Sequence, residues 1–207
     1  MSALPRSVFA EALTYPAFQA LVTRLAHEHR TSGPEQHPFL IQTTQQNQAV
    51  LDADHGLPLL PELVALLRQV PNRWFWAVLG EAWCGDTAHQ VQLLAHLASE
   101  SENQVELRIL LRSEHPDVMA AYQTNGKDSI PKLVCLEADT MQTLGTWGPR
   151  PAAAQQLAEQ LHANKELHAT QVSQQMNEWY NADQGQSFQR ELLPLVAEWV
   201  ALRQAAR

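Results

Sequence analysis

The segment at residues 73–86 constrains the fold of this chain more than any other. It begins with the apolar and aromatic run Arg-Trp-Phe-Trp-Ala-Val-Leu-Gly at 73–80. Such a run predicts a strand buried on both faces of a parallel or mixed sheet. The sequence Glu-Ala-Trp-Cys-Gly-Asp follows at 81–86, and apolar residues at helical spacing continue from 87 to about 100. The pattern therefore places Cys84 at a strand-to-helix junction.

The segments after this helix complete an α/β arrangement. A second strand is expected at 105–111 and a short helix at 117–122, which together with the first strand make a β-α-β unit. Two further strands, at 132–137 and 142–147, flank a polar turn and predict an antiparallel hairpin. A helix follows at 152–165. The sequence thus predicts an α/β fold with a central mixed sheet of about four strands and flanking helices.

Additional helices are expected at both ends of the chain. Apolar residues recur at helical spacing from 8 to about 29, with an interruption at Pro16. They recur again at 59–70. Two apolar stripes in the last forty residues predict further helices, whereas the Gln-rich stretch 42–48 is interpreted as a loop. The chain is therefore divided into an N-terminal helical extension packed on the core (1–58), the α/β domain (59–165) and a C-terminal helical extension (166–207).

Charge and composition exclude several classes of partner. A formal net charge of −8 without a Lys/Arg cluster argues against nucleic acid and against an anionic membrane surface. Glu11 falls where an export signal needs apolar residues, and no apolar stretch approaches the length of a membrane span. We therefore expect a cytoplasmic location, where Cys84 and Cys135 stay reduced. The amphipathic ends are compatible with a monomer or a dimer.

The two cysteines have different settings. Free N–H groups and the helix dipole stabilise a thiolate at the start of a helix, and Thr87, one turn on, is placed to donate a hydrogen bond to it. Negative charge on Glu81 and Asp86 opposes the thiolate. We expect Cys84 to be an accessible thiol of lowered or near-normal pKa, with a vestigial residue in a binding or structural module as the alternative. Cys135 lies in an apolar run and is expected in the core, unbridged.

No metal site is expected. None of the nine histidines falls with Cys84 in a compact ligand pattern, so all nine are interpreted as surface or incidental residues.

The order of these elements resembles the thioredoxin superfamily over residues 59–165. In that superfamily a reactive cysteine opens a helix and a cis-proline lies downstream, and here Cys84 and Pro131 are 47 positions apart. More narrowly, the chain resembles bacterial thioredoxin-like proteins in which Trp-Cys-Gly-Asp replaces the two-cysteine motif. They share segments like Ser-Ile-Pro-Lys at 129–132 and Gly-Thr-Trp-Gly-Pro-Arg-Pro at 145–151.

This resemblance implies roles for individual residues. Cys84 corresponds to the attacking cysteine and Pro131 to the cis-proline beside it, which exposes the backbone of Ile130 for pairing with an extended peptide. Thr87 replaces the second cysteine, so a mixed disulfide cannot be resolved within the motif. The candidate catalytic residues are Cys84, Thr87 and Pro131, and the candidate substrate-binding residues are Trp83, Gly85, Asp86, Ile130 and Gly148.

The resemblance implies a monothiol disulfide oxidoreductase or thiol-exchange protein. Cys84 would attack a protein or peptide disulfide, or accept a low-molecular-weight thiol, and an external thiol such as glutathione would complete the cycle as co-substrate. No other cofactor is expected. The alternative is a redox-inactive module that holds a peptide or protein partner in the groove of Cys84 and Pro131.

Overall fold

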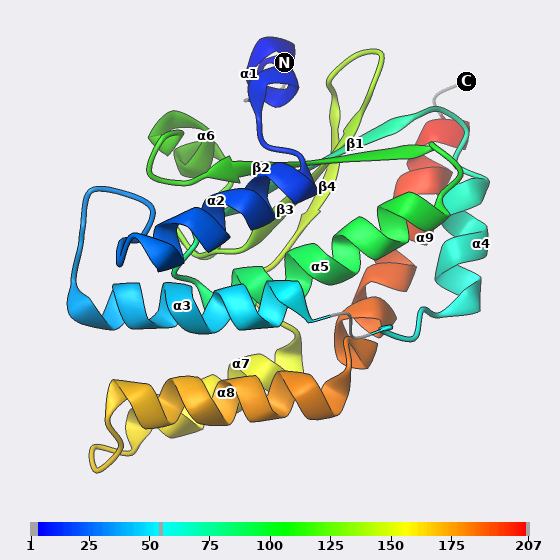
Figure 1. The fold of residues 1–207 in the computed structure, drawn as a ribbon. Coiled ribbons are helices and arrows are strands. Elements are labelled where there is room, and N and C mark those ends of the chain that lie inside the picture. The colour runs from blue at the N-terminus through cyan, green and yellow to red at the C-terminus, as the bar shows by residue number, and fades with distance from the viewer. Residues whose placement is uncertain (1–3, 54–55, 206–207) are drawn as a thin grey trace.

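The computed structural model describes residues 4–53 and 56–205, and its centre is a four-stranded mixed sheet in the order β2-β1-β3-β4. The central strand β1 pairs parallel with β2 and antiparallel with β3, which pairs antiparallel with β4. This confirms the predicted α/β class and the mixed sheet (Figure 1). The strands are β1 (Trp74–Gly80), β2 (Val105–Leu111), β3 (Lys132–Glu137) and β4 (Thr143–Trp147).

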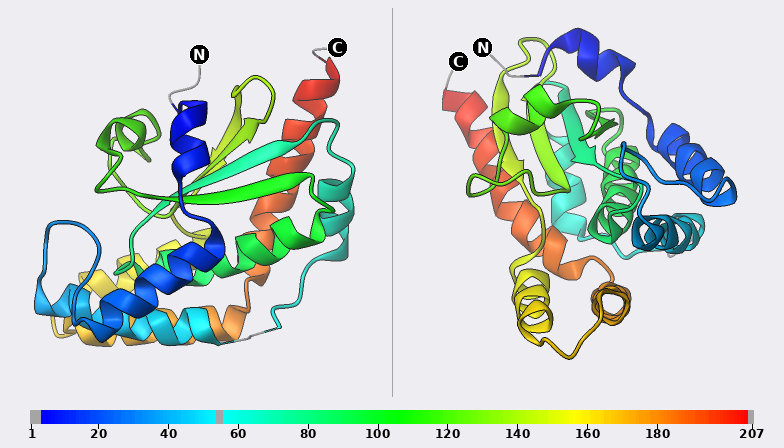
Figure 2. Two further views of the ribbon diagram at one scale, coloured as in Figure 1. Left: turned by 45° about the horizontal axis from the view of Figure 1, so that its top comes forward. Right: turned by 90° about the vertical axis from the view of Figure 1, so that its left-hand side faces the viewer.

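Helices surround this sheet unevenly. One face is covered by α2, α4, α5 and α9, the other by α1 and α6, while α7 and α8 form a hairpin away from the sheet (Figures 1 and 2). The helices are α1 (Arg6–Glu11), α2 (Tyr15–His27), α3 (Pro38–Asp52), α4 (Pro61–Arg68), α5 (Gly85–Glu100), α6 (Pro116–Ala121), α7 (Ala152–Ala163), α8 (Ala169–Asp183) and α9 (Gln186–Ala205).

Strand β1 separates two apolar clusters. Its seven residues are all buried, as the continuous apolar run predicts. Trp74, Trp76 and Val78 join the cluster under α5, and the alternating residues join the cluster under α1 and α6. Because successive side chains of a strand point to opposite faces, a central strand covered on both sides needs apolar residues at every position.

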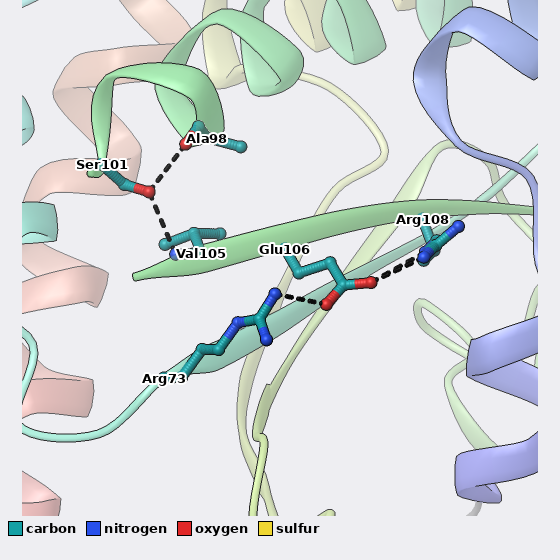
Figure 3. A network of polar contacts seen from close by, with 6 residues as sticks. All are labelled: Arg73, Ala98, Ser101, Val105, Glu106 and Arg108. Atoms are coloured by element: carbon teal, nitrogen blue, oxygen red, sulfur yellow. Dashed lines mark hydrogen bonds and ion pairs between the residues drawn. The ribbon is translucent and has the colours of Figure 1, made fainter. Parts of the chain in front are cut away.

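Polar contacts tie helix α5 to strand β2 and stabilise the sheet surface (Figure 3). The Ser101 hydroxyl donates to the carbonyl of Ala98 at 2.7 Å and accepts from the amide of Val105 at 3.0 Å. Glu106 on β2 forms ion pairs with Arg73 and Arg108, each at 2.7 Å. The connection between α5 and β2 is thereby held close, which helps to fix the helix that Cys84 opens.

The helical run at 8–29 is interrupted as expected, but the break lies at 12–14 between α1 and α2. Pro16 itself lies in the first turn of α2, after the N-cap Thr14, whose hydroxyl accepts from the amide of Ala17 at 3.3 Å. Proline suits this position because the first N–H groups of a helix have no partner within the helix. The expectation of a loop at the Gln-rich stretch 42–48 is wrong, because this stretch is part of α3.

The spacing of apolar residues does not predict helix α3, because the buried side of this helix is largely polar. Thr43, Thr44 and Asn47 are buried there together with Leu51. A hydrophobic periodicity cannot reveal a helix whose inward residues are hydroxyls and amides. The helix packs on α2 and α5, so the N-terminal segment lies beside the helix that follows Cys84.

The C-terminal helix α9 crosses the outer strand β4. A Cβ atom at Gly145 would lie 2.0 Å from the indole nitrogen of Trp199, so the close approach of helix and strand requires glycine. Within residues 4–53 and 56–205, none of the helices combines the length and the apolar composition needed to cross a bilayer.

Candidate functional site

Cys84 lies at the N-cap of α5, against the segment that precedes β3. Its thiol donates to the carbonyl oxygen of Ile130 at 3.7 Å, and its amide donates to the carbonyl of Glu81 at 3.2 Å. The Ile130–Pro131 peptide bond is cis, the conformation that the resemblance implies. The structure thus brings together Cys84, Ile130 and Pro131 although 46 residues separate the first two.

Gly148 supports the same loop from the end of β4. Its φ is +123°, and a Cβ atom there would lie 2.3 Å from the carbonyl oxygen of Pro131. Only glycine allows both this backbone conformation and this approach. Gly148 therefore holds the segment after β4 against the loop beside Cys84.

The expectation of a lowered or near-normal pKa for Cys84 is wrong, and the exposed area of the residue is small. The residue is 7 % exposed, and its sulfur packs with the apolar cluster under α1 and α6. This burial, with a further contribution from the negative charge of Asp86, raises the pKa of Cys84 to about 11. The side chain and backbone of Thr87, which are placed to donate to a thiolate, and the charge of Arg150 lower that pKa, but they do not outweigh the burial.

Thr87 lies beside the sulfur with an unused hydroxyl. The residue is fully buried, and its Oγ1 has no hydrogen-bond partner among the residues that the structure describes. The Cys84 thiol meanwhile donates to Ile130. Loss of the thiol proton would create an acceptor beside this buried donor, so Thr87 is placed to stabilise the thiolate rather than the thiol.

A buried polar network surrounds Asp86, and most of it was not predicted from the sequence. Arg150 forms an ion pair with the carboxylate at 2.5 Å, and the hydroxyl of Tyr180 donates to it at 2.7 Å. The Gln90 amide donates to Tyr180 at 3.3 Å and to the carbonyl of Pro149 at 3.0 Å. Burial and the charge of Asp86 raise the pKa of Tyr180 far above its usual range.

This network ties the C-terminal helices to the cysteine motif. Tyr180 belongs to α8 and lies 94 residues beyond Asp86. No local pattern in the sequence indicates the contact between Asp86 and Tyr180. Arg150, in contrast, lies in the Gly-Pro-Arg-Pro segment on which the family resemblance rests.

The turn before Cys84 is held by the N-terminal segment. The buried carboxylate of Glu81 accepts from the hydroxyl of Ser32 and, at 2.7 Å, from the amide of Ser113. The side-chain amide of Asn47 donates to the carbonyl of Ala82 at 2.8 Å. Segments on both sides of the α/β domain thus position the motif.

Two cavities meet at Cys84. An open groove of about 890 Å³ extends past Ile130 and the loop before it, and a cavity of about 240 Å³ lies among α3, α7 and α8. The predicted site residues Trp83, Cys84 and Asp86 line both, as does Arg150, while Gly85 lines only the smaller cavity and Gly148 only the groove. Cys84 can therefore be reached from two directions despite its small exposed area.

Cys135 lies apart from this site. It is fully buried in the cluster under α5, on the opposite face of the sheet, and burial raises its pKa well above the usual range. Both cysteines are free thiols.

The histidine interpretation needs one correction. His89 is half-buried, stacks on Tyr180 with ring centroids 4.6 Å apart and contacts Asn177 at 3.2 Å, so it belongs to the packing behind the motif. Within the described ranges, no group of three or more His, Cys, Asp or Glu residues is arranged to hold a metal ion.

The chain belongs to the thioredoxin family, because the thioredoxin family model matches residues 33–162, which is more than half of the chain. The match begins before the expected domain boundary at residue 59 and ends close to the one at 165. It stops short of α8, which supplies Tyr180 to the site.

Comparison with solved structures supports the same fold. A protein of unknown function from Pseudomonas aeruginosa is 18 % identical, with a TM-score of 0.52 over 96 % of each chain. An HIV epitope scaffold is 16 % identical, with a TM-score of 0.52 over 97 % of this chain and 98 % of its own. No curated protein matches. These likenesses show that the chain shares its overall fold with both solved structures, whereas the thioredoxin assignment rests on the family match.

Removing the charge of Asp86 is expected to make Cys84 more reactive. The carboxylate raises the pKa of the thiol, so Asp86→Asn should lower that pKa and speed alkylation by iodoacetamide severalfold at pH 8. Tyr180→Phe is the matched control, because it removes a hydrogen bond from the same network and keeps the charge. An equal acceleration in both variants would show that loosened packing, and not charge, governs the rate.

Proposed function

We propose that this protein is a single-cysteine thiol-disulfide exchange protein, in which Cys84 attacks a disulfide and an external thiol completes the cycle. The observation that carries the proposal is the position of the Cys84 sulfur, 3.7 Å from the Ile130 carbonyl at the junction of two cavities. A sulfur held there faces the backbone against which an extended substrate would pair. A cytoplasmic, reducing compartment would supply the external thiol.

The exchange runs in two balanced steps. The Cys84 thiolate attacks one sulfur of a disulfide R–S–S–R′, forms Cys84–S–S–R and releases R′S⁻, which takes up a proton. An external thiolate R″S⁻ then attacks the sulfur of R, forms R–S–S–R″ and returns the electron pair to Cys84. Trp83 and Asp86 line the groove in which R would lie, and Thr87 would donate to each thiolate that forms on Cys84.

The raised pKa gives this reaction a distinct pH dependence. Below its pKa the thiolate fraction of a thiol rises about tenfold for each pH unit. The rate of Cys84 modification by the neutral reagent bis(2-hydroxyethyl) disulfide should therefore climb from pH 7 to 10 and level off near the pKa of about 11. An ordinary thiol would level off near pH 9.

Mapping the adducts by mass spectrometry tests the proposal. The native protein should carry the adduct on Cys84, with little on Cys135 until it is unfolded, and Cys84→Ser should carry none when folded. Dithiothreitol should release the adduct and restore the free thiol. Native Cys84 that resists the reagent as strongly as Cys135 at pH 9 would contradict exchange chemistry.

Such resistance would instead favour the redox-inactive binding module. The burial of Cys84 and its raised pKa favour such a module, because a buried neutral thiol is a poor nucleophile. A module of this kind should keep its partner in the Cys84→Ser variant, whereas an exchange protein should lose its covalent adduct.

A further inference from the structure

The groove beside Cys84 contains a buried lysine without a carboxylate partner. Lys132 directly follows Pro131, lines the groove and is 7 % exposed. Its Nζ donates to the hydroxyl of Thr124 at 3.0 Å, and no carboxylate oxygen of the described residues lies within 4.0 Å of it. Burial lowers the pKa of Lys132. An ammonium group in this position is costly for the protein alone, since a buried charge needs an opposite one.

A second cation lines the same groove and contacts the same 124–128 loop as Lys132. The guanidinium of Arg112 lies over the ring of Trp83, 5.3 Å from its centroid, and donates to the backbone carbonyl of Asp128 at 2.9 Å. It too has no carboxylate within ion-pair distance in the described part of the chain. The exposed side chains of Lys127 and Asp128 also line the groove, and the Asp128 carboxylate accepts from Gln123.

The remaining charged side chains that line the groove are paired, hydrogen-bonded or exposed. Asp86 is paired with Arg150, Glu191 accepts two hydrogen bonds, and Glu159 accepts one and is exposed. Lys132 and Arg112 thus lack carboxylate partners among the described residues although the chain carries a net charge of −8. Two such cations in one groove, one of them a buried ammonium, indicate a site for an anionic group.

We propose that Lys132 and Arg112 bind a carboxylate of the disulfide that exchanges with Cys84, so that the site selects anionic low-molecular-weight disulfides and thiols. This inference rests on the proposed function and names its substrate class. Ile130, whose carbonyl contacts the Cys84 sulfur, lies two residues before Lys132. The sulfur and the ammonium are therefore close enough for one small molecule to contact both.

The test compares disulfides that differ in charge. Wild-type protein and Lys132→Gln are treated with 3,3′-dithiodipropionate and 4,4′-dithiodibutyrate, which are anionic and differ in reach, with neutral bis(2-hydroxyethyl) disulfide and with cationic cystamine. Rates of Cys84 modification are read by mass spectrometry. The ratio of variant to wild type for each reagent cancels its intrinsic reactivity. Lys132→Gln should slow at least one anionic reagent about tenfold, leave the neutral one within twofold and speed cystamine.

Lys165→Gln serves as the matched control, because it removes the same charge from an exposed position outside the groove. It should leave all four rates unchanged. If Lys132→Gln slows the anionic and neutral reagents by the same factor, or slows neither anionic reagent, the inference is wrong while the proposed function stands.

Two further measurements cover the remaining outcomes. If Cys84 reacts with none of the reagents, the proposed function fails, and calorimetric titration of Cys84→Ser with 3,3′-dithiodipropionate decides the inference. Binding lost on adding Lys132→Gln supports it, and equal or absent binding overturns it. The second measurement compares the rates of Cys84 modification by disulfide-linked peptides that carry either Glu or Gln beside the cysteine. If the wild-type protein prefers the Glu peptide over the Gln peptide as strongly as it prefers anionic over neutral small disulfides, the assignment to low-molecular-weight compounds is wrong.

Discussion

Replacing Thr87 by cysteine is expected to raise the reduction of insulin-type disulfides by at least about tenfold with dithiothreitol as the reductant. The wild-type protein cannot expel a bound partner from within, whereas a thiol at this position attacks the mixed disulfide intramolecularly, with a high effective concentration. The Thr87 side chain and backbone already face the Cys84 sulfur. The measurement is the turbidity of released insulin chains at pH 7 and 8.

The packing around Thr87 favours this substitution. A Cβ at Gly80 would lie 2.5 Å from the Thr87 methyl carbon, so the space beside the residue is tightly filled, and cysteine needs less of it because it lacks that methyl group. Thr87→Ser is the matched control, since it also removes the methyl group but adds no thiol. Combining Thr87→Cys with Cys84→Ser should abolish the gain. A gain that persists in this double variant would mean that Cys84 is not the attacking group.

Gly148→Ala is expected to lower the free energy of unfolding by about 3 kcal/mol or more. Two costs add at this position, because φ is +123° and the new Cβ would meet the Pro131 carbonyl oxygen at 2.3 Å. The contact is with backbone, so no side chain can rotate away. Urea unfolding followed by tryptophan fluorescence measures the change.

Gly126→Ala separates the two costs. Gly126 also has a positive φ, +71°, but nothing lies within 4 Å of a Cβ placed there. This variant should lose only about 1 kcal/mol, which is the penalty of the backbone conformation alone. Similar losses in the two variants would show that the segment after β4 does not press on Pro131 as described.

The α/β class and the place of Cys84 at a strand-to-helix junction follow from the sequence alone. The run at 74–80 has no polar side chain, which suits a central strand covered on both faces, and helical periodicity resumes directly after the motif. Both are local patterns that depend on residues close together in the chain. The helix that contains 42–48 does not follow from such a local pattern. Its buried side chains include Thr and Asn, and their burial depends on partners far away in the chain.

The state of Cys84 was decided by the tertiary structure. A helix N-terminus lowers the pKa of a thiol, and the sequence could indicate that much. The structure adds an apolar cluster around the sulfur and a carboxylate nearby, and together these raise the pKa to about 11. Desolvation depends on every atom that excludes water from the sulfur, and residues from α1, α6 and the loop before β3 contribute to that cluster.

Long-range pairing likewise placed the groups that define the site. Asp86 meets Tyr180 across 94 residues, and the chain bends so that Lys132 lies in the Cys84 groove without a carboxylate partner among the described residues. The sequence determined which side chains carry charge, hydroxyl or thiol, together with the local elements that present them. Which charges are neutralised and which stay available for a ligand was set only by packing, because electrostatic energy depends on distance and burial rather than on separation along the chain.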